Sequence, residues 1–434
     1  MKIRNLIVAM LILISISVTA QEKPQQWDLS SCINYALTNN IQIQKAKISL
    51  EANVVETKQA KAQLLPNLSA SASQNLSYYP AGSLGIYTGS YGISSSMILF
   101  DGGKSLKTIE VQKLQEEAGK YNIISNEKSI QMSILGSYTK ILYANEAVNV
   151  YDNTLKASEY QFNRGEELLK AGSISKADLA QLASQLSSDK YQLVVAQNTL
   201  SSARLELKQL LELNPGEEIS ISIPELNNVD ILKPLTSLQA IYETALNVMP
   251  EIKTAKLDMQ VSSLEITKAK AGYLPKINLN ASTGTNHSSN STYSFNTQLS
   301  DGFYAGVGVS VSVPIFSNRD NKSTLEKAKL NEKTAELNIK DTEKSMLKEI
   351  ESVYQDALSA QSQYWAGTEK VKALETSYNL IEQQFNLGMK NTLELLTEKN
   401  NLLSARQNMM QAKYLSIMDM QILNLYQDIP VEIK

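Results

Sequence analysis

An internal duplication constrains this 434-residue chain more than any other feature of its sequence. The segment 60–68, Ala-Lys-Ala-Gln-Leu-Leu-Pro-Asn-Leu, recurs 209 residues later at 269–277 as Ala-Lys-Ala-Gly-Tyr-Leu-Pro-Lys-Ile. Further along, Gly172 matches Gly388 at an offset of 216, so the offset grows by seven residues in between. A duplicated unit in which one loop has become longer explains both offsets.

The duplication predicts one body made of two similar halves, although the length alone would suggest two or three domains. Repeat one covers about 27–213 and repeat two about 236–428. The change of offset falls within the stretch of the repeat that contains the predicted strands. We therefore expect the seven extra residues in the outward-facing loop of the second strand pair.

The first twenty residues have the pattern of a secretory signal peptide. Lys2 and Arg4 precede an apolar run over 6–18, and small residues stand before Gln21. The run is short for a membrane helix, which needs about 20 residues, although an N-terminal membrane helix is the alternative. We expect 1–20 to be removed and 21–434 to form the mature chain. No other stretch is apolar enough for a membrane helix, so any membrane insertion would have to use strands.

The composition argues against several functions. The net charge is −3, or −5 once the two basic residues of the signal peptide are lost, which argues against nucleic acid as a partner. The only cysteine, Cys32, excludes an internal disulfide, and the only histidine, His287, lies among Ser and Asn, where we expect a loop. No catalytic triad, metal-ligand cluster or phosphate loop is recognisable, so we expect neither an enzyme nor a bound cofactor.

Each half shows the same predicted order: helix, helix, strand, strand, very long helix, long helix. Residues 29–63 have a helical pattern that is broken near Asn39 and Asn40. The stretch 104–169 contains no proline and is repeated at 322–387, which predicts helices of roughly 100 Å at 1.5 Å per residue.

Strand pairs are predicted at about 67–99 and 276–313, because apolar and small polar residues alternate there with period two. Tyrosine and phenylalanine cluster at one end of each pair, as in the aromatic girdles of membrane barrels. Two soluble hairpins with exposed tyrosines are the alternative. Four strands cannot close a barrel, which needs about eight, so the edges require other copies of the chain. Three copies would supply twelve strands, which predicts a homotrimer.

The helices after the two matched glycines carry an apolar heptad seam that is typical of coiled coils. In the first half, Asp189 alone breaks this series, which otherwise consists of Leu179, Leu182, Leu186, Leu193, Ala196, Leu200, Ala203, Leu207 and Leu210. A long helix, a tight turn and a second helix predict an antiparallel helical hairpin in each half. The tips of these hairpins are expected near 170–173 and 386–391.

The order and spacing of these features resemble the outer-membrane efflux protein family, the TolC-type channels. The resemblance covers the mature chain and includes both helix-to-strand junctions, the segment Leu-Phe-Asp-Gly-Gly-Lys at 99–104, and Phe-Asn-Leu-Gly-Met-Lys-Asn-Thr-Leu-Glu-Leu-Leu at 385–396. It implies a mainly α fold with membrane β: a trimeric, twelve-stranded β-barrel in the bacterial outer membrane, continued by a long α-helical barrel in the periplasm.

The resemblance also implies a function and a set of partners. The family forms the exit duct of tripartite efflux or type I-like export systems and is not enzymatic. Its channels pass substrates outward from an inner-membrane transporter and a periplasmic adaptor (membrane fusion) protein. The expected surroundings of this chain are therefore two further copies of itself, outer-membrane lipid, an adaptor and a pump.

Five residues match the family's periplasmic entrance. Gly172 and Gly388 correspond to the hairpin tips that contact the adaptor, and Asp178, Lys390 and Glu394 to the entrance or gate. The family's second acidic ring position is occupied here by Thr397, so we expect one ring of Glu394 from three chains. The resemblance also suggests Asp178 as the partner of Lys390. Ordinary solvated helix charges are the alternative interpretation of these three side chains.

Two other functions fit parts of the sequence. An exported coiled-coil adhesin or scaffold without a pore would share the heptad seams and the signal peptide. A periplasmic adaptor is also built on helical hairpins. Neither class requires paired alternating strands with aromatic ends together with duplicated tip glycines, so the sequence favours the export duct.

Overall fold

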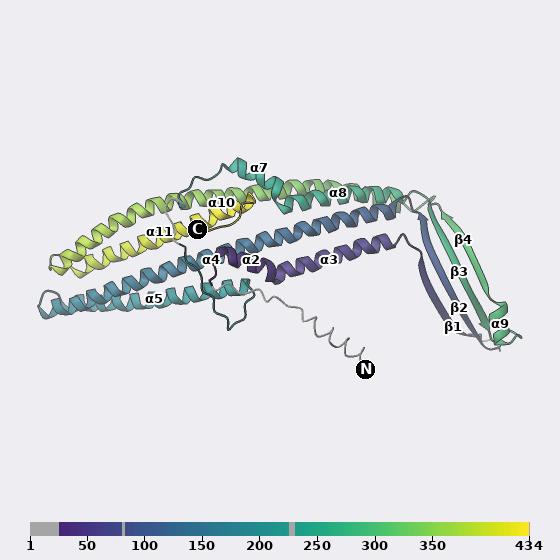
Figure 1. Cartoon of the computed structure of the whole chain (residues 1–434), viewed down its shortest axis with the longest axis horizontal. Helices are drawn as coiled ribbons and strands as arrows, with labels where there is room; N and C mark the ends of the chain where they lie inside the picture. Colours follow the sequence, from purple (N-terminus) through teal and green to yellow (C-terminus); the bar gives the residue numbers. More distant parts are fainter. Residues whose placement is uncertain (1–25, 80–82, 225–230, 434) are drawn as a thin grey trace, which may run out of the picture.

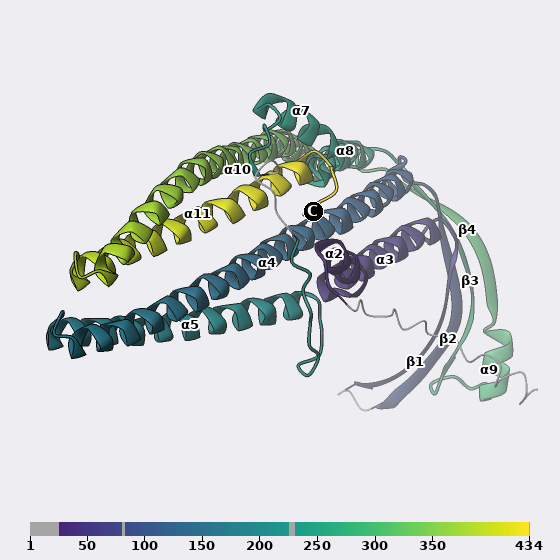
Figure 2. The same cartoon turned by 60° about the vertical axis from the view of Figure 1, so that its left-hand side comes forward.

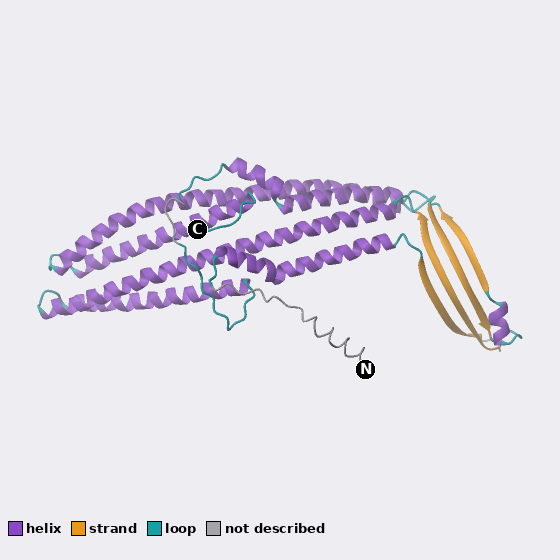
Figure 3. Cartoon of the chain, viewed as in Figure 1, coloured by secondary structure: helices purple, strands orange, loops and turns teal. Residues whose placement is uncertain are grey.

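The computed structural model describes residues 26–79, 83–224 and 231–433; the expected signal peptide at 1–20 lies outside these ranges. The described chain is elongated, with a four-stranded sheet at one end and long helices over the remaining length (Figure 1). Figure 3 shows this division: strands occupy one end, and helices run from there to the two hairpin tips at the other. Among the described helices, none combines the length and the hydropathy that a membrane crossing requires.

The two halves repeat the same elements in the same order. The first half contains α2 (Leu29–Asn39), α3 (Ile41–Ala62), β1 (Asn67–Tyr79), β2 (Ser83–Phe100), α4 (Lys104–Lys170) and α5 (Lys176–Leu210). The second contains α7 (Leu238–Val248), α8 (Pro250–Ala271), β3 (Lys276–Ser288), α9 (Phe295–Asp301), β4 (Tyr304–Ser312), α10 (Asp320–Asn386) and α11 (Thr392–Tyr426). The helices α4 and α10 both have 67 residues, and α5 and α11 both have 35.

The break between the first two helices is built by Asn40. Its side chain accepts a hydrogen bond from the backbone N–H of Gln42 at 2.9 Å and so begins α3, while its own N–H donates to the carbonyl of Ala36 at 2.8 Å and ends α2. Its side-chain amide also donates to the carbonyl of Leu210 at the end of α5. In the second half the same break is made by Pro250 at the first position of α8.

The sheet is antiparallel throughout, in the order β1-β2-β3-β4, so β2 and β3 join the two halves. One face is polar, with hydroxyl pairs such as Ser69–Ser94 at 2.9 Å and Ser73–Ser90 at 2.7 Å between Oγ atoms. The other face is apolar and exposed, and its cross-strand pairs include Ala70–Ile93, Leu279–Val309 and Ile277–Val311. Each strand thus carries two unlike faces, as the alternation in the sequence predicts.

The connection between β3 and β4 contains a short helix that the sequence analysis did not predict. This helix, α9, has seven residues, the same number by which the repeat offset grows. His287 was expected in a loop, which is wrong: it lies in β3, is buried, and packs edge-on against Phe295 of α9 with ring centroids 4.8 Å apart. Gly89 lies opposite on β2, where a Cβ would collide with the imidazole.

The helices form two long antiparallel hairpins, α4–α5 and α10–α11, which lie side by side (Figure 2). α8 packs against both α4 and α10, and α3 packs against α4. The largest apolar core lies midway along the molecule, where α2 and the middle of α4 meet the C-terminal turns of α5 and α11. There Tyr138 donates a hydrogen bond to the carbonyl of Ser222 at 2.6 Å, which ties the inter-repeat connection to α4.

Candidate functional site

The two hairpin tips have the same backbone geometry. Gly172 and Gly388 have φ values of +75° and +77°, a left-handed conformation in which a side chain would be strained. The residue after each glycine closes the turn: Ser173 donates its N–H to the carbonyl of Leu168 and Met389 to that of Gln384, both at 2.8 Å. This is the glycine-dependent end of a helix known as the Schellman motif. The tips therefore reverse the chain sharply after α4 and α10.

Asp178 is part of a capping box that begins α5. Its backbone N–H donates to the Ser175 hydroxyl at 3.1 Å, and its carboxylate accepts from the Ser175 backbone N–H at 3.0 Å. The Ser175 hydroxyl also donates to the carboxylate at 2.7 Å, and these two hydrogen bonds from the Ser175 hydroxyl and backbone N–H lower the pKa of Asp178. The hydroxyl of Thr392 at the other tip adds a smaller effect of the same sign, although it does not reach hydrogen-bond geometry. Asp178 therefore lies beside the second tip as a carboxylate.

Glu394 has the same place in α11, with Asn391 as the capping residue. The Glu394 N–H donates to the Asn391 side chain at 2.8 Å, and the Asn391 N–H donates to the Glu394 carboxylate at 3.2 Å. Its other carboxylate oxygen lies 2.6 Å from the ammonium of Lys390. Lys390, and then the Asn391 backbone, lower the pKa of Glu394. Both carboxylate oxygens are thus engaged within their own hairpin.

The suggested pairing of Lys390 with Asp178 is not the one that this chain makes. Lys390 instead bonds Glu394, four residues away and on the same tip. The physical reason is proximity: the capping box holds the Glu394 carboxylate beside the first turn of α11, within reach of the preceding lysine, while Asp178 is held by Ser175.

Below the tips, an apolar cluster joins the two hairpins. Phe385, which is 1% exposed, packs with Leu168, Leu182 and Leu395, so that one side chain comes from each of the four long helices. A phenyl ring fits this dry position, whereas a tyrosine hydroxyl would need a polar partner. The hairpins of one chain are therefore held together directly behind the charged side chains.

The two tips differ in what they expose. Leu387, Met389 and Leu393 on the second tip are 75%, 71% and 66% exposed. The positions that match them in the first repeat are occupied by Ala171, Ser173 and Ala177. The second tip therefore presents an apolar surface to its surroundings, and the first presents a small and polar one.

Sequence reasoning missed a buried ionic cluster farther along the hairpins. Lys399 of α11 lies 2.6 Å from the carboxylate of Asp189 of α5, and the two side chains are 5% and 2% exposed. Ser158 of α4 hydrogen-bonds with both. Burial, opposed by Asp189, lowers the pKa of Lys399. The signal was present, since Asp189 is the residue that interrupts the heptad seam.

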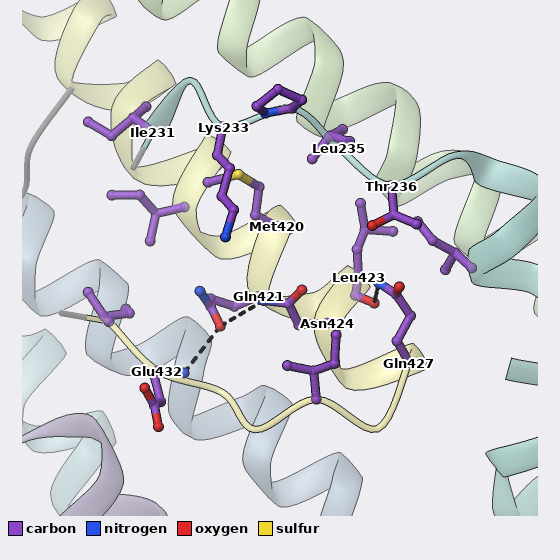
Figure 4. Close-up of a pocket in the computed structure, with 15 residues that line it drawn as sticks. Ile231, Lys233, Leu235, Thr236, Met420, Gln421, Leu423, Asn424, Gln427 and Glu432 are labelled. Carbon is purple, nitrogen blue, oxygen red and sulfur yellow. Dashed lines mark hydrogen bonds between the residues drawn. The ribbon is translucent and has the colours of Figure 1, made fainter. Parts of the chain in front are cut away.

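A pocket at the C-terminal end of α11 is lined mainly by residues before α7, by the last turns of α11 and by residues that follow α11 (Figure 4). It lies roughly 40 Å along α11 from Glu394, at 1.5 Å per residue, so it is separate from the tips. Within the described ranges, no group of three or more His, Cys, Asp or Glu side chains is placed to hold a metal ion.

Comparison with known proteins shows the following similarities. The sequence model described as "Outer membrane efflux protein" matches residues 32–212 and 241–421, two stretches whose starts are 209 residues apart. Outer membrane efflux protein BepC of Brucella suis is 20% identical over 408 residues, which cover 94% of this chain and 87% of BepC. Outer membrane protein TolC of Escherichia coli K12 is 23% identical, with 93% and 83% covered.

A solved structure is similar along nearly the whole chain. The outer membrane protein VceC of Vibrio cholerae superposes with a TM-score of 0.76 at 17% identity, and the match covers 93% of this chain and 97% of VceC. This similarity confirms the fold class predicted from the sequence.

Proposed function

The chain belongs to the outer membrane efflux protein family, and on that premise we propose that three copies of it form an export duct. The family resemblance inferred from the sequence is thereby confirmed. The protein is an outer-membrane efflux channel with its helical part in the periplasm. Substrates pass through it from an inner-membrane transporter and a periplasmic adaptor to the outside. This is transport, and we assign no catalytic step to it.

The observation that best supports this function is the open sheet. Within the described chain, β1 pairs with β2 alone and β4 with β3 alone, so each sheet has two free edges. A membrane strand cannot leave its backbone groups unpaired in lipid. Three copies joined edge to edge supply twelve strands, with the apolar faces toward lipid and the serine-rich faces toward the lumen.

The entrance is proposed at the tips around Gly172 and Gly388. Three copies would bring three Glu394 carboxylates around one aqueous opening, with Asp178 and Lys390 beside them. A ring of carboxylates attracts cations and repels anions. Lys390 neutralises part of this charge because it bonds the same carboxylate, so we expect a moderate preference for cations.

The adaptor is proposed to dock at the same end. The exposed Leu387, Met389 and Leu393 support this proposal, because apolar groups gathered at a protruding tip are typical of a protein contact. The first tip would add backbone and hydroxyl groups to the same contact.

Conductance measurements test both the proposed export duct and the proposed ring of Glu394 carboxylates. In planar bilayers the purified protein should conduct, and Glu394→Gln should lower the cation-to-anion permeability ratio by about twofold or more. Glu243→Gln on α7 makes the same change of net charge away from the tips and should leave the ratio unchanged.

The alternatives give different outcomes. A coiled-coil surface scaffold would fractionate with the outer membrane and never conduct. An adaptor would not enter the outer-membrane fraction at all. If wild type and Glu394→Gln both conduct with the same ion selectivity, the proposed export duct stands and the proposed ring of Glu394 carboxylates is refuted.

A further inference from the structure

The buried ion pair between Asp189 and Lys399 connects the two hairpins of one chain. Asp189 belongs to α5 of the first hairpin and Lys399 to α11 of the second. The ammonium lies 2.6 Å from one carboxylate oxygen, and Gln185 donates to the other at 2.9 Å. Ser158 of α4 completes the cluster, so three helices contribute to it. A pair this deeply buried is costly to separate, because each charge would lose its partner in a dry environment.

The internal repeat shows that this pair is asymmetric. At the offset of 216, Asp189 matches Ala405 and Lys399 matches Ala183. The second hairpin is apolar at the level where the first carries its acid: Ala405 packs there with Val371 and Leu402. At this cluster, each hairpin thus contributes one buried charge of its own sign and has alanine where the other hairpin has its charge.

In the proposed trimer, which this inference takes as its premise, six similar hairpins alternate around one tube. Every first hairpin then lies between two second hairpins, one from its own chain and one from the next chain. Apolar seams alone discriminate poorly between such similar neighbours and between axial registers. A single buried polar contact in a coiled-coil seam selects one arrangement, since the others leave a charge buried without a partner.

We propose that the Asp189–Lys399 ion pair is the device that makes each first hairpin pack against the second hairpin of its own chain, in one axial register. Its role is the specificity of assembly. Loss of the pair as a whole therefore costs little stability, whereas loss of one partner is damaging.

Substitutions in the full-length chain test this directly. Asp189→Lys alone and Lys399→Asp alone each place like charges in the buried site, and each should reduce the yield of trimer, measured by native gel and light scattering, about tenfold. The double variant Asp189→Lys/Lys399→Asp restores opposite charges and should recover the yield to within about twofold of wild type.

Co-expression shows where the pair forms. When chains with Asp189→Lys are produced together with chains with Lys399→Asp, opposite charges can meet only across a chain boundary. No rescue of the trimer yield is expected. A trimer yield clearly above that of either single variant alone would overturn the proposal, because two of the three chain boundaries in a mixed trimer would then bring opposite charges together.

The double variant Asp189→Ala/Lys399→Ala is the matched control, since it gives each repeat the residue of the other. Its melting temperature should stay within a few degrees of wild type, while its trimers should be heterogeneous and form several-fold less efficiently. Assembly as uniform and efficient as wild type would refute the inference even if the swapped variant misfolds. A wild-type protein that forms no trimer would instead refute the proposed duct.

Discussion

At the scale of the residue, the spacing of residues in the sequence identified the positions of the charged side chains at the tips more reliably than it identified their bonding partners. Asp178 and Glu394 were selected because each lies six residues after a tip glycine, and each begins its helix with a capping box. Their proposed role at the entrance remains a prediction. The choice of Glu394 over Asp178 as the partner of Lys390 depended on where the capping boxes hold the carboxylates, which the spacing alone does not specify.

Asp419 of α11 makes the protein's stability depend on pH. It is 6% exposed, and burial, with the charge of Asp356 second, raises its pKa from 3.8 to about 7. A raised carboxyl pKa means that the folded state holds this proton more tightly than the unfolded state does. The contribution of Asp419 to stability is therefore full below about pH 4, falls as pH rises from there to about 7, and stays low above that range.

We expect Asp419→Asn to remove this dependence and to raise the free energy of unfolding at pH 8 by roughly 2–4 kcal/mol. Thermal melts in detergent at pH 5 and pH 8 measure it. Asp356→Asn removes only the second cause and should give a smaller gain. Equal melting-temperature differences between the two pH values in wild type and Asp419→Asn would contradict the assignment.

At the scale of the element, glycines with different backbone conformations respond oppositely to the same substitution. Gly388 and Gly136 both have free space where a Cβ would be, so only the backbone decides the outcome. Gly388→Ala forces a side chain into a left-handed turn and should destabilise the protein by roughly 1–2 kcal/mol. Gly136→Ala lies within α4 and should stabilise it by about 0.5–1 kcal/mol.

Circular dichroism melts of the two single variants test this pair. A loss of stability in Gly136→Ala would mean that another group occupies its open side in the assembled protein. An unchanged melting temperature in Gly388→Ala would show that the tip adopts another turn when it carries a side chain.

Most of the helices and strands could be predicted from the periodicity of the sequence. Period two marked the strands, and the absence of proline over long stretches marked α4 and α10. The short helix α9 and the burial of His287 could not be predicted in this way. A seven-residue helix is too short to show a period. His287 is buried because Phe295 of α9 and two tyrosines of β2, Tyr87 and Tyr91, pack against it, and Gly89 leaves room for its ring.

At the scale of the whole molecule, the two faces of the sheet should tolerate charge differently. Val309 and Ser310 are neighbours on β4 and face opposite sides, pairing with Leu279 and Asn278. In the proposed barrel Val309→Lys places an ammonium in lipid, at a cost of roughly 2 kcal/mol, and Ser310→Lys places it in the lumen. We expect Val309→Lys to lower the amount of protein in the outer-membrane fraction and Ser310→Lys to leave it near wild type.

Quantitative immunoblots of the separated membrane fractions measure the effect. The opposite order, with Ser310→Lys depleted and Val309→Lys normal, would mean that the sheet curves the other way and that its apolar face lines the lumen.

The sequence by itself determined the duplicated architecture, the alternating strands, the long helices and the glycine turns. These follow from local spacing, because period, proline and glycine act within a few residues of one chain. Only the tertiary structure decided that Lys390 bonds Glu394, that His287 is buried and that Asp189 meets Lys399. Such contacts join residues up to 210 positions apart, and their energies depend on burial and on which partner lies within a few ångströms.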